Sequence, residues 1–263
     1  MDFLDAKQDV QKTKARWDKV ADRFQKNTSK NREKEETPFE YLKGKNIIDK
    51  NLTVLDLGCG AGRFLTSFSK ECKEVVGVDI SEKMIEKANE NIQKEYLNNA
   101  KAFVMVWQDD KDYNIIKKKS FDLVFASMTP AVHNKQTLEK MCEVSKKHCF
   151  LSGFIERQNK IQDLLDEKVF LKSPEKSFGK RIYSIMNILW DMGYCPEIKY
   201  VDTYWLDEMT FEEAKIWFTA MRDDISEEKK KEVCDFLKTL EDENGIIKNE
   251  TYSKLGWIYW TVD

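Results

Sequence analysis

Three closely spaced glycines follow a short apolar run in the first quarter of the chain. Residues 54–57 lead into Gly58, Gly60 and Gly62, and a helix-compatible segment begins at Phe64. This succession predicts a strand, a glycine turn and a helix. Such a turn brings backbone N–H groups close to a ligand bound at the helix N-terminus. The stretch therefore predicts a binding site at the end of the first strand.

Two carboxylates belong to the same pattern. Asp79 ends a second apolar run about twenty residues further on, where it can accept hydrogen bonds from a ribose. Asp56 precedes Gly58, and a carboxylate there repels a pyrophosphate but suits a ligand with an ammonium group and a sulfonium. Arg63 replaces the last glycine of the dinucleotide pattern, and no phosphate-binding Gly-Lys-Ser/Thr follows. These features favour a nucleoside cofactor that is positively charged.

The segment Asp56-x-Gly58-x-Gly60-x-Gly62, followed by Gly77-Val78-Asp79-Ile80-Ser81, resembles motifs I and II of the class I S-adenosylmethionine-dependent methyltransferases. The resemblance implies S-adenosylmethionine as cofactor and S-adenosylhomocysteine as product. The cofactor contacts expected within the two motifs are Asp56, Gly58, Cys59, Gly60, Asp79 and Ile80. The alternative for the glycines is a tight turn in some other α/β protein.

The resemblance also implies cofactor contacts outside these motifs. A polar residue at the end of the third strand contacts the adenine amino group in this family, which points to Asp109 or Gln108, and Ser127 ends the fourth strand. Trp17, with Asp18, resembles the aromatic-acid signature of an N-terminal segment that folds over the cofactor. The alternative for that segment is a plain surface helix, and the alternative for Asp109 is an acidic start of a loop.

Alternating apolar strand and helix patterns predict an α/β fold with right-handed crossovers. With the resemblance, this becomes a doubly wound, seven-stranded, mostly parallel sheet of the Rossmann-like class I type. The expected strands lie near residues 52–57, 75–78, 102–107, 121–126, 149–155, 198–205 and 255–262. The expected divisions are an N-terminal helical lid (1–50), a cofactor-binding core (51–206), a helical cap inserted between the last two strands (207–250) and the last core strand (251–263).

The acceptor site is expected where segments leave the carboxyl ends of the strands. The cap would cover it, with Tyr204, Trp205 and Trp217 as candidate lining residues, although a place in the core is the favoured interpretation for any one of them. Methyl transfer needs a base only if the acceptor is protonated, and His133, just past the fourth strand, is the candidate. Its alternative is an ordinary loop residue. His148 lies at the opposite end of a strand and is expected to be structural.

The amino-acid composition limits which classes of partner molecule we expect. The 263-residue chain has 44 basic and 47 acidic residues, so it shows no electrostatic footprint for nucleic acid. The segment Ser127-Met128-Thr129-Pro130 also lacks the Asn/Asp-Pro-Pro-Tyr/Phe of amino-group methylases, which favours a small-molecule acceptor. The six cysteines form no C-x-x-C pair and no metal site, and they indicate a reducing compartment.

No signal peptide or membrane span is visible, so we expect a cytoplasmic protein with no membrane partner. Two other functions stay open: a methyltransferase that acts on RNA or protein, and an inactive cofactor-binding module. The sequence gives no indication of the oligomeric state.

Overall fold

A computed structural model describes residues 9–28, 36–108, 116–173, 179–222 and 225–262. The chain divides into two compact units. The first comprises Met1–Gly153, Lys180–Tyr200 and Gly256–Asp263, and the second comprises Phe154–Gly179 and Val201–Leu255.

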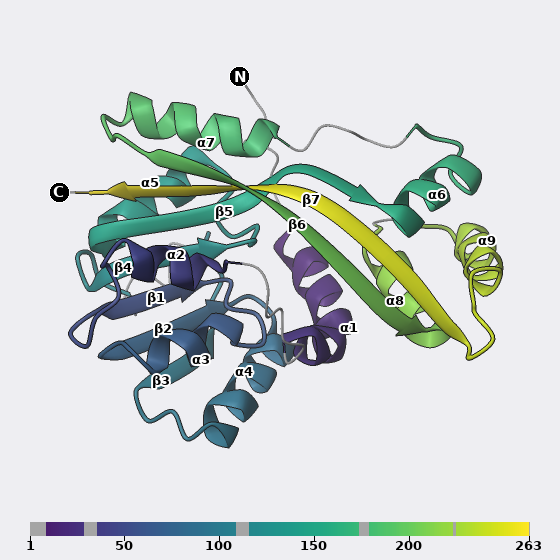
Figure 1. The fold of residues 1–263 in the computed structure, drawn as a ribbon, viewed down its shortest axis with the longest axis horizontal. Coiled ribbons are helices and arrows are strands. Elements are labelled where there is room, and N and C mark those ends of the chain that lie inside the picture. The colour runs from purple at the N-terminus through teal and green to yellow at the C-terminus, as the bar shows by residue number, and fades with distance from the viewer. Residues whose placement is uncertain (1–8, 29–35, 109–115, 174–178, 223–224, 263) are drawn as a thin grey trace. The chain divides into compact units, whose positions relative to one another are not determined.

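A seven-stranded sheet has the strand order β3-β2-β1-β4-β5-β7-β6. The strands are β1 (Thr53–Leu57), β2 (Glu74–Asp79), β3 (Ala100–Val104), β4 (Phe121–Ser127), β5 (Ser145–Asn159), β6 (Glu197–Thr210) and β7 (Ile246–Thr261). The pairs β1–β2, β1–β4, β2–β3 and β4–β5 are parallel. β7 runs opposite to β5 (Figure 1), so the sheet is mixed. The predicted α/β fold with a seven-stranded, mostly parallel sheet is confirmed.

The first unit has helices with and without a side-chain cap at their N-terminus. They are α1 (Val10–Thr28), α2 (Pro38–Gly44), α3 (Arg63–Ser69), α4 (Glu82–Lys94), α5 (Lys135–Val144) and α7 (Lys180–Asp191). Thr37, Ser81 and Asn134 cap α2, α4 and α5 through their side-chain oxygens. α5 ends at Val144, and the next residue, Ser145, already pairs with Phe121 in the sheet.

The core of the first unit lies around the central strands. The side chains of β1 and β4 that face the helices are fully buried, and the rings of Phe125 and Phe150 stack at 5.0 Å. Phe68 of α3 meets the Phe125 ring edge-on at 5.1 Å, and Trp257 lies against Phe150. This aromatic layer fixes the strands whose carboxyl ends carry the candidate site.

The second unit has its own core. α6 (Lys160–Lys168), α8 (Phe211–Ala220) and α9 (Glu227–Lys238) pack with the parts of β6 and β7 that belong to this unit (Figure 1). Its buried apolar residues are Ile161, Leu165, Val169, Met209, Ala214, Phe218, Val233, Leu237 and Ile247. The unit contains the two helices expected at 207–250 together with residues 154–179. Trp217 is partly buried against this core.

Candidate functional site

The glycine turn joins β1 to α3 and is attached to β2. Gly58, Gly60 and Gly62 have φ angles of +69°, +54° and +84°, which residues with a side chain rarely adopt. The N–H groups of Gly58 and Cys59 both donate to the carbonyl oxygen of Val78, at 2.8 and 3.0 Å. The turn predicted from the glycine spacing is therefore a fixed backbone loop at the carboxyl ends of β1 and β2.

Two glycines also leave space for neighbouring side chains. A Cβ atom on Gly58 would lie 2.0 Å from Oγ1 of Thr129, so Thr129 occupies the space beside the turn. A Cβ atom on Gly77 would lie 2.9 Å from Sγ of Cys59 and 2.8 Å from Leu65. Burial raises the pKa of the Cys59 thiol well above its ordinary value, helped by the charges of nearby carboxylates. The Cys59 side chain therefore packs against β2 as a small apolar group.

Asp79 holds the turn and the start of α4 at the same time. Its Oδ2 accepts a hydrogen bond from the N–H of Gly60 at 3.0 Å, and its Oδ1 accepts one from Ser81 at 2.9 Å. Burial raises the pKa of Asp79, while backbone N–H donors, including that of Ile80, oppose the rise. Each oxygen keeps acceptor capacity, since a carboxylate oxygen offers two lone pairs.

Asp56 lies in β1, next to the glycine turn, and its carboxylate has too few hydrogen-bond partners for a buried charge. Its side chain is buried, and its Oδ2 has no hydrogen-bond partner. Burial, followed by the charge of Asp79, raises the pKa of Asp56 to about 8. A cationic group at this position would supply the missing partner and restore the charged carboxylate.

Helix α1 is attached to α4, the helix that follows Asp79. Oδ1 of Asp18 accepts hydrogen bonds from Oγ of Ser81 at 2.6 Å and from the N–H of Lys83 at 3.3 Å. Lys14 forms an ion pair with Glu82 at 2.6 Å. Trp17 meets Phe24 of the same helix edge-on, with ring centroids 5.3 Å apart. The structure therefore places the predicted Trp17 on a helix whose next residue contacts the start of α4.

The segment after β4 is held by β5. Oγ of Ser127 lies 3.0 Å from Oγ of Ser152, and the N–H of Met128 donates to the same Ser152 hydroxyl at 3.1 Å. Met128 has a φ angle of +55°, which is strained for a residue with a side chain. The predicted Ser127 thus uses its hydroxyl to fix this segment.

His133 is half-buried at the end of the same segment. Its Nδ1 lies 3.4 Å from the carbonyl oxygen of Ala131, and its Nε2 lies 3.4 Å from Nδ2 of Asn134. Burial lowers the pKa of His133; the carbonyl of Ala131 opposes this, and the charge of Arg181 adds to the lowering. The imidazole is therefore uncharged at neutral pH. His148, by contrast, lies 2.8 Å from the hydroxyl of Tyr259 within the first unit.

Arg181 was not predicted from the sequence, where it is one cation at the start of an apolar helix. Its guanidinium is buried, and its Nη2 donates to the carbonyl oxygens of Thr129 and Val132, at 2.8 and 2.7 Å. These carbonyls belong to the segment that ends at His133. A basic residue that early in α7 could have been identified only by knowing that α7 reaches this segment.

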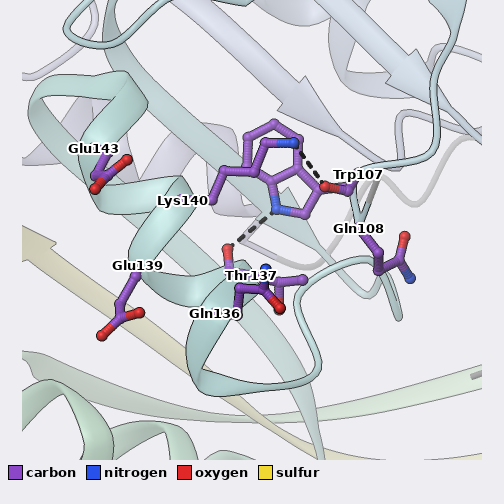
Figure 2. A pocket seen from close by; sticks show the side chains of 7 residues that line it. All are labelled: Trp107, Gln108, Gln136, Thr137, Glu139, Lys140 and Glu143. Carbon is purple, nitrogen blue, oxygen red and sulfur yellow. Dashed lines mark hydrogen bonds between the residues drawn. The ribbon is translucent and has the colours of Figure 1, made fainter. Parts of the chain in front are cut away.

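The predicted adenine-side residues follow β3. β3 ends at Val104, earlier than expected, because Trp107 turns to pack against α5 and donates from Nε1 to the carbonyl of Thr137 at 3.1 Å. Lys140 donates to the Trp107 carbonyl at 2.9 Å and lies 4.6 Å from its ring centroid. Gln108 borders a pocket lined mainly by α5 (Figure 2). Asp109 lies outside the described residues.

Apart from Trp107, the side chains that line this pocket are polar or charged (Figure 2). It is lined by Trp107, Gln108, Gln136, Thr137, Glu139, Lys140 and Glu143. The lining includes no residue of the glycine turn and neither Asp56 nor Asp79, so this pocket is separate from those two carboxylates. Among the described residues, no group of three or more His, Cys, Asp or Glu side chains could hold a metal ion. No described helix has the length and apolar character needed to cross a membrane.

Comparison with known sequences gives relatives of several kinds. An uncharacterized protein of Haemophilus influenzae is 27% identical over 158 residues, which cover 59% of this chain and 56% of that protein. The 23S rRNA (uracil(1939)-C(5))-methyltransferase RlmD of Vibrio parahaemolyticus is 38% identical over 71 residues, covering 27% of this chain and 16% of that enzyme. The matches thus span little more than half of one relative and a sixth of the other.

Among solved structures, the fold is similar to that of magnesium protoporphyrin IX methyltransferase (ChlM) from Synechocystis PCC 6803, determined with bound S-adenosylhomocysteine. The TM-score is 0.55 at 17% identity, and the alignment covers 74% of this chain and 93% of that one. Residues 48–180, which contain the glycine turn, both carboxylates and the segment after β4, match the family described as "Methyltransferase domain". This chain belongs to that methyltransferase family and has its class I fold.

Proposed function

We propose that this chain binds S-adenosylmethionine and transfers its methyl group to a small-molecule acceptor, releasing S-adenosylhomocysteine. Asp56 carries the proposal, because it is a buried carboxylate with an unpartnered oxygen beside the glycine turn. A buried carboxylate needs a cationic partner to remain charged. The amino-acid part of S-adenosylmethionine has both an ammonium group and a sulfonium, so it fits this site.

Residues of the turn and of the ends of β1 and β2 beside it have roles in this proposal. Asp56 pairs with the ammonium group, and Asp79 accepts hydrogen bonds from the ribose hydroxyls. Gly58 and Gly60 leave the backbone open to the cofactor because they have no side chains. The main chain of Cys59 and Ile80 completes this part of the site.

The proposed site also includes groups outside the turn. Gln108 and Asp109 serve the adenine end, Ser127 borders the methyl-transfer side, and Trp17 covers the cofactor from α1. The attachment of α1 to Ser81 supports the inclusion of Trp17, because Ser81 also donates a hydrogen bond to Asp79.

When bound, the cofactor supplies a methyl group on a positively charged sulfur that leaves as a neutral thioether. The protein then has to align the acceptor and exclude water. His133 is the proposed base for an acceptor that is protonated at neutral pH. Burial lowers the pKa of His133 and so favours the uncharged imidazole, which is the form that accepts a proton.

Isothermal titration with S-adenosylmethionine, S-adenosylhomocysteine and NAD tests the cofactor assignment. We expect micromolar binding of the first two and none of NAD. Asp79→Ala should abolish binding while the protein stays folded, and Asp202→Asn, an exposed carboxylate of the second unit, should leave affinity unchanged. Failure of both sulfur nucleosides to bind the folded protein would overturn the cofactor assignment.

The acceptor class needs a separate experiment. The formal net charge of −3 supports a small molecule, while the similarity to RlmD favours RNA as the second candidate. We would incubate the protein with methyl-labelled cofactor and separate fractions of small metabolites, total RNA and protein. Label in the metabolite fraction supports the proposal, and label only in RNA or protein overturns it. Cofactor binding without transfer to any fraction would favour an inactive module.

A cytoplasmic location is part of the same proposal. Its support is that all six cysteines are free thiols, as expected in a reducing compartment.

A further inference from the structure

The guanidinium of Arg181 is a buried cation that donates hydrogen bonds to backbone carbonyls. Among the described residues, no carboxylate forms an ion pair with it, and its Nε has no hydrogen-bond partner. Burial lowers the pKa of Arg181 to about 10, so the group still carries its charge at neutral pH. Leaving a buried charge uncompensated is costly, which makes a purely packing role a poor explanation.

The two hydrogen bonds of Arg181 go to one short segment. A single nitrogen, Nη2, donates to the carbonyls of Thr129 and Val132. Gly153 of β5 lies next to this arrangement: a Cβ atom there would be in ordinary contact with Nη1 of Arg181 at 3.4 Å and closer, at 3.0 Å, to Ile182. The guanidinium therefore fixes the backbone of residues 129–132.

Fixing that segment affects both of its ends. At one end, the side chain of Thr129 occupies the space beside Gly58 of the cofactor turn. At the other, His133 follows Val132 directly, and Arg181 is the charged residue that acts on its imidazole. Among the described residues, the other groups at the ring are uncharged: the backbone carbonyls of Ala131 and Pro130 and the side-chain amide of Asn134. The segment that Arg181 holds thus reaches the glycine turn at one end and the candidate base, His133, at the other.

We propose that Arg181 is a positioning residue, which holds residues 129–133 against the glycine turn. Its importance for methyl transfer rests on the proposed function. Its effects on His133 and on the turn can be measured without an acceptor.

NMR titration of the imidazole signals tests the electrostatic part. The chain has two histidines, so His133→Asn assigns the signals and His148 serves as an internal reference. Arg181→Met removes charge and donors, Arg181→Gln keeps donors without charge, and Arg181→Lys keeps the charge. Lys180→Met, which removes the exposed cation one position earlier on α7, is the matched control.

We expect the pKa of His133 to rise in Arg181→Met and Arg181→Gln, and to stay at its wild-type value in Arg181→Lys and Lys180→Met. The His148 signal should not move in any variant. If Arg181→Met does not fold, Arg181→Gln carries the test. An unchanged His133 pKa in the folded Gln variant would overturn the electrostatic part of the proposal.

Titration with S-adenosylhomocysteine tests the positioning part. Because hydrogen bonds from charged donors are among the stronger ones, we expect affinity about tenfold weaker in Arg181→Met, with substantial recovery in Arg181→Lys. Wild-type affinity in Arg181→Met would overturn the positioning part. If the wild-type protein itself does not bind, the proposed cofactor fails, while the His133 titration still decides the role of Arg181.

Discussion

The carboxylate of Asp18 accepts a hydrogen bond from the hydroxyl of Ser81, and the two oxygens are 2.6 Å apart. The same hydroxyl accepts a hydrogen bond from Met84 as the N-cap of α4, so Asp18 extends that cap from a different helix. The N–H of Ser81 meanwhile donates to Asp79. A helix that precedes the sheet in sequence is therefore linked, through one serine, to the carboxylate proposed to hold the ribose.

Asp18→Ala should loosen α1 from α4. The variant loses hydrogen bonds from Ser81 and Lys83, which should cost about 1 kcal/mol of docking free energy. Hydrogen exchange of the α1 amides measures the change, and we expect faster exchange there. Asp22→Ala is the matched control: Asp22 lies on the same helix, and its side chain, 90% exposed, makes only a surface ion pair with Lys87 of α4 at 3.4 Å, which should contribute less than the buried cap. Equal exchange in the two variants would contradict a specific role for Asp18.

Gly58→Ala and Gly60→Ala should differ in stability although both glycines have positive φ angles. A Cβ atom at Gly58 collides with Thr129, whereas one at Gly60 meets nothing within 4 Å. Gly60→Ala should therefore lose about 1–2 kcal/mol from backbone strain alone. Gly58→Ala should lose that amount plus roughly 1–3 kcal/mol from overpacking. Urea denaturation gives both values, and equal losses would contradict the close contact with Thr129.

Asp56→Asn should stabilise the cofactor-free protein at pH 8. The pKa of Asp56 is about 8 in the folded protein and about 4 in the unfolded chain, so the folded state holds the proton more tightly. The wild type therefore loses stability as the pH rises from about 4 to 8, and the asparagine variant escapes this loss. At pH 8 the difference should reach a few kcal/mol, on the order expected for a large pKa shift.

Denaturation curves at pH 5 and pH 8 measure the Asp56 effect. Asp202→Asn, at an exposed position, should keep the wild-type pH dependence. The asparagine variant should also bind S-adenosylmethionine more weakly, because it cannot pair with the ammonium group. A wild-type pH slope in Asp56→Asn would show that another group causes it.

Thr251→Val should destabilise the second unit. Thr251 is buried, and its Oγ1 accepts a hydrogen bond from Nδ2 of Asn159 at 2.6 Å. Valine preserves the shape but leaves the Asn159 amide unsatisfied, which should cost about 1–3 kcal/mol. Thr251→Ser keeps the hydroxyl and loses one methyl group, so it should cost less. The comparison uses urea denaturation, and the opposite order would contradict the hydrogen bond.

The first half of the sheet was predictable because its buried strands are continuous apolar runs that end at glycines or carboxylates. β7 was predicted to begin only near Leu255, but it starts at Ile246. Its inward positions Asn249 and Thr251 are polar yet buried, which hides the apolar alternation. Their partners, the backbone of Ile161 and the side chain of Asn159, come from a distant segment that local sequence does not reveal.

Within the site, the motif residues were predictable because glycine spacing and flanking carboxylates reflect local geometry. Arg181 was not, since its role depends on α7 reaching a segment about fifty residues earlier. The apolar pattern predicts a third strand that continues to residue 107, whereas β3 ends at Val104, for a related reason. Trp107 continues an apolar run, but its burial comes from contact with α5 and not from the sheet.

The two backbone hydrogen bonds to Asp79 have a consequence for the thermodynamics of binding. Both carboxylate oxygens are already oriented by the N–H groups of Gly60 and Ser81, so a ligand meets an acceptor that has lost its rotational freedom during folding. This preorganisation removes an entropic penalty from association. The length of the side chain at this position is also critical, because a glutamate would move its carboxylate oxygens away from both N–H donors.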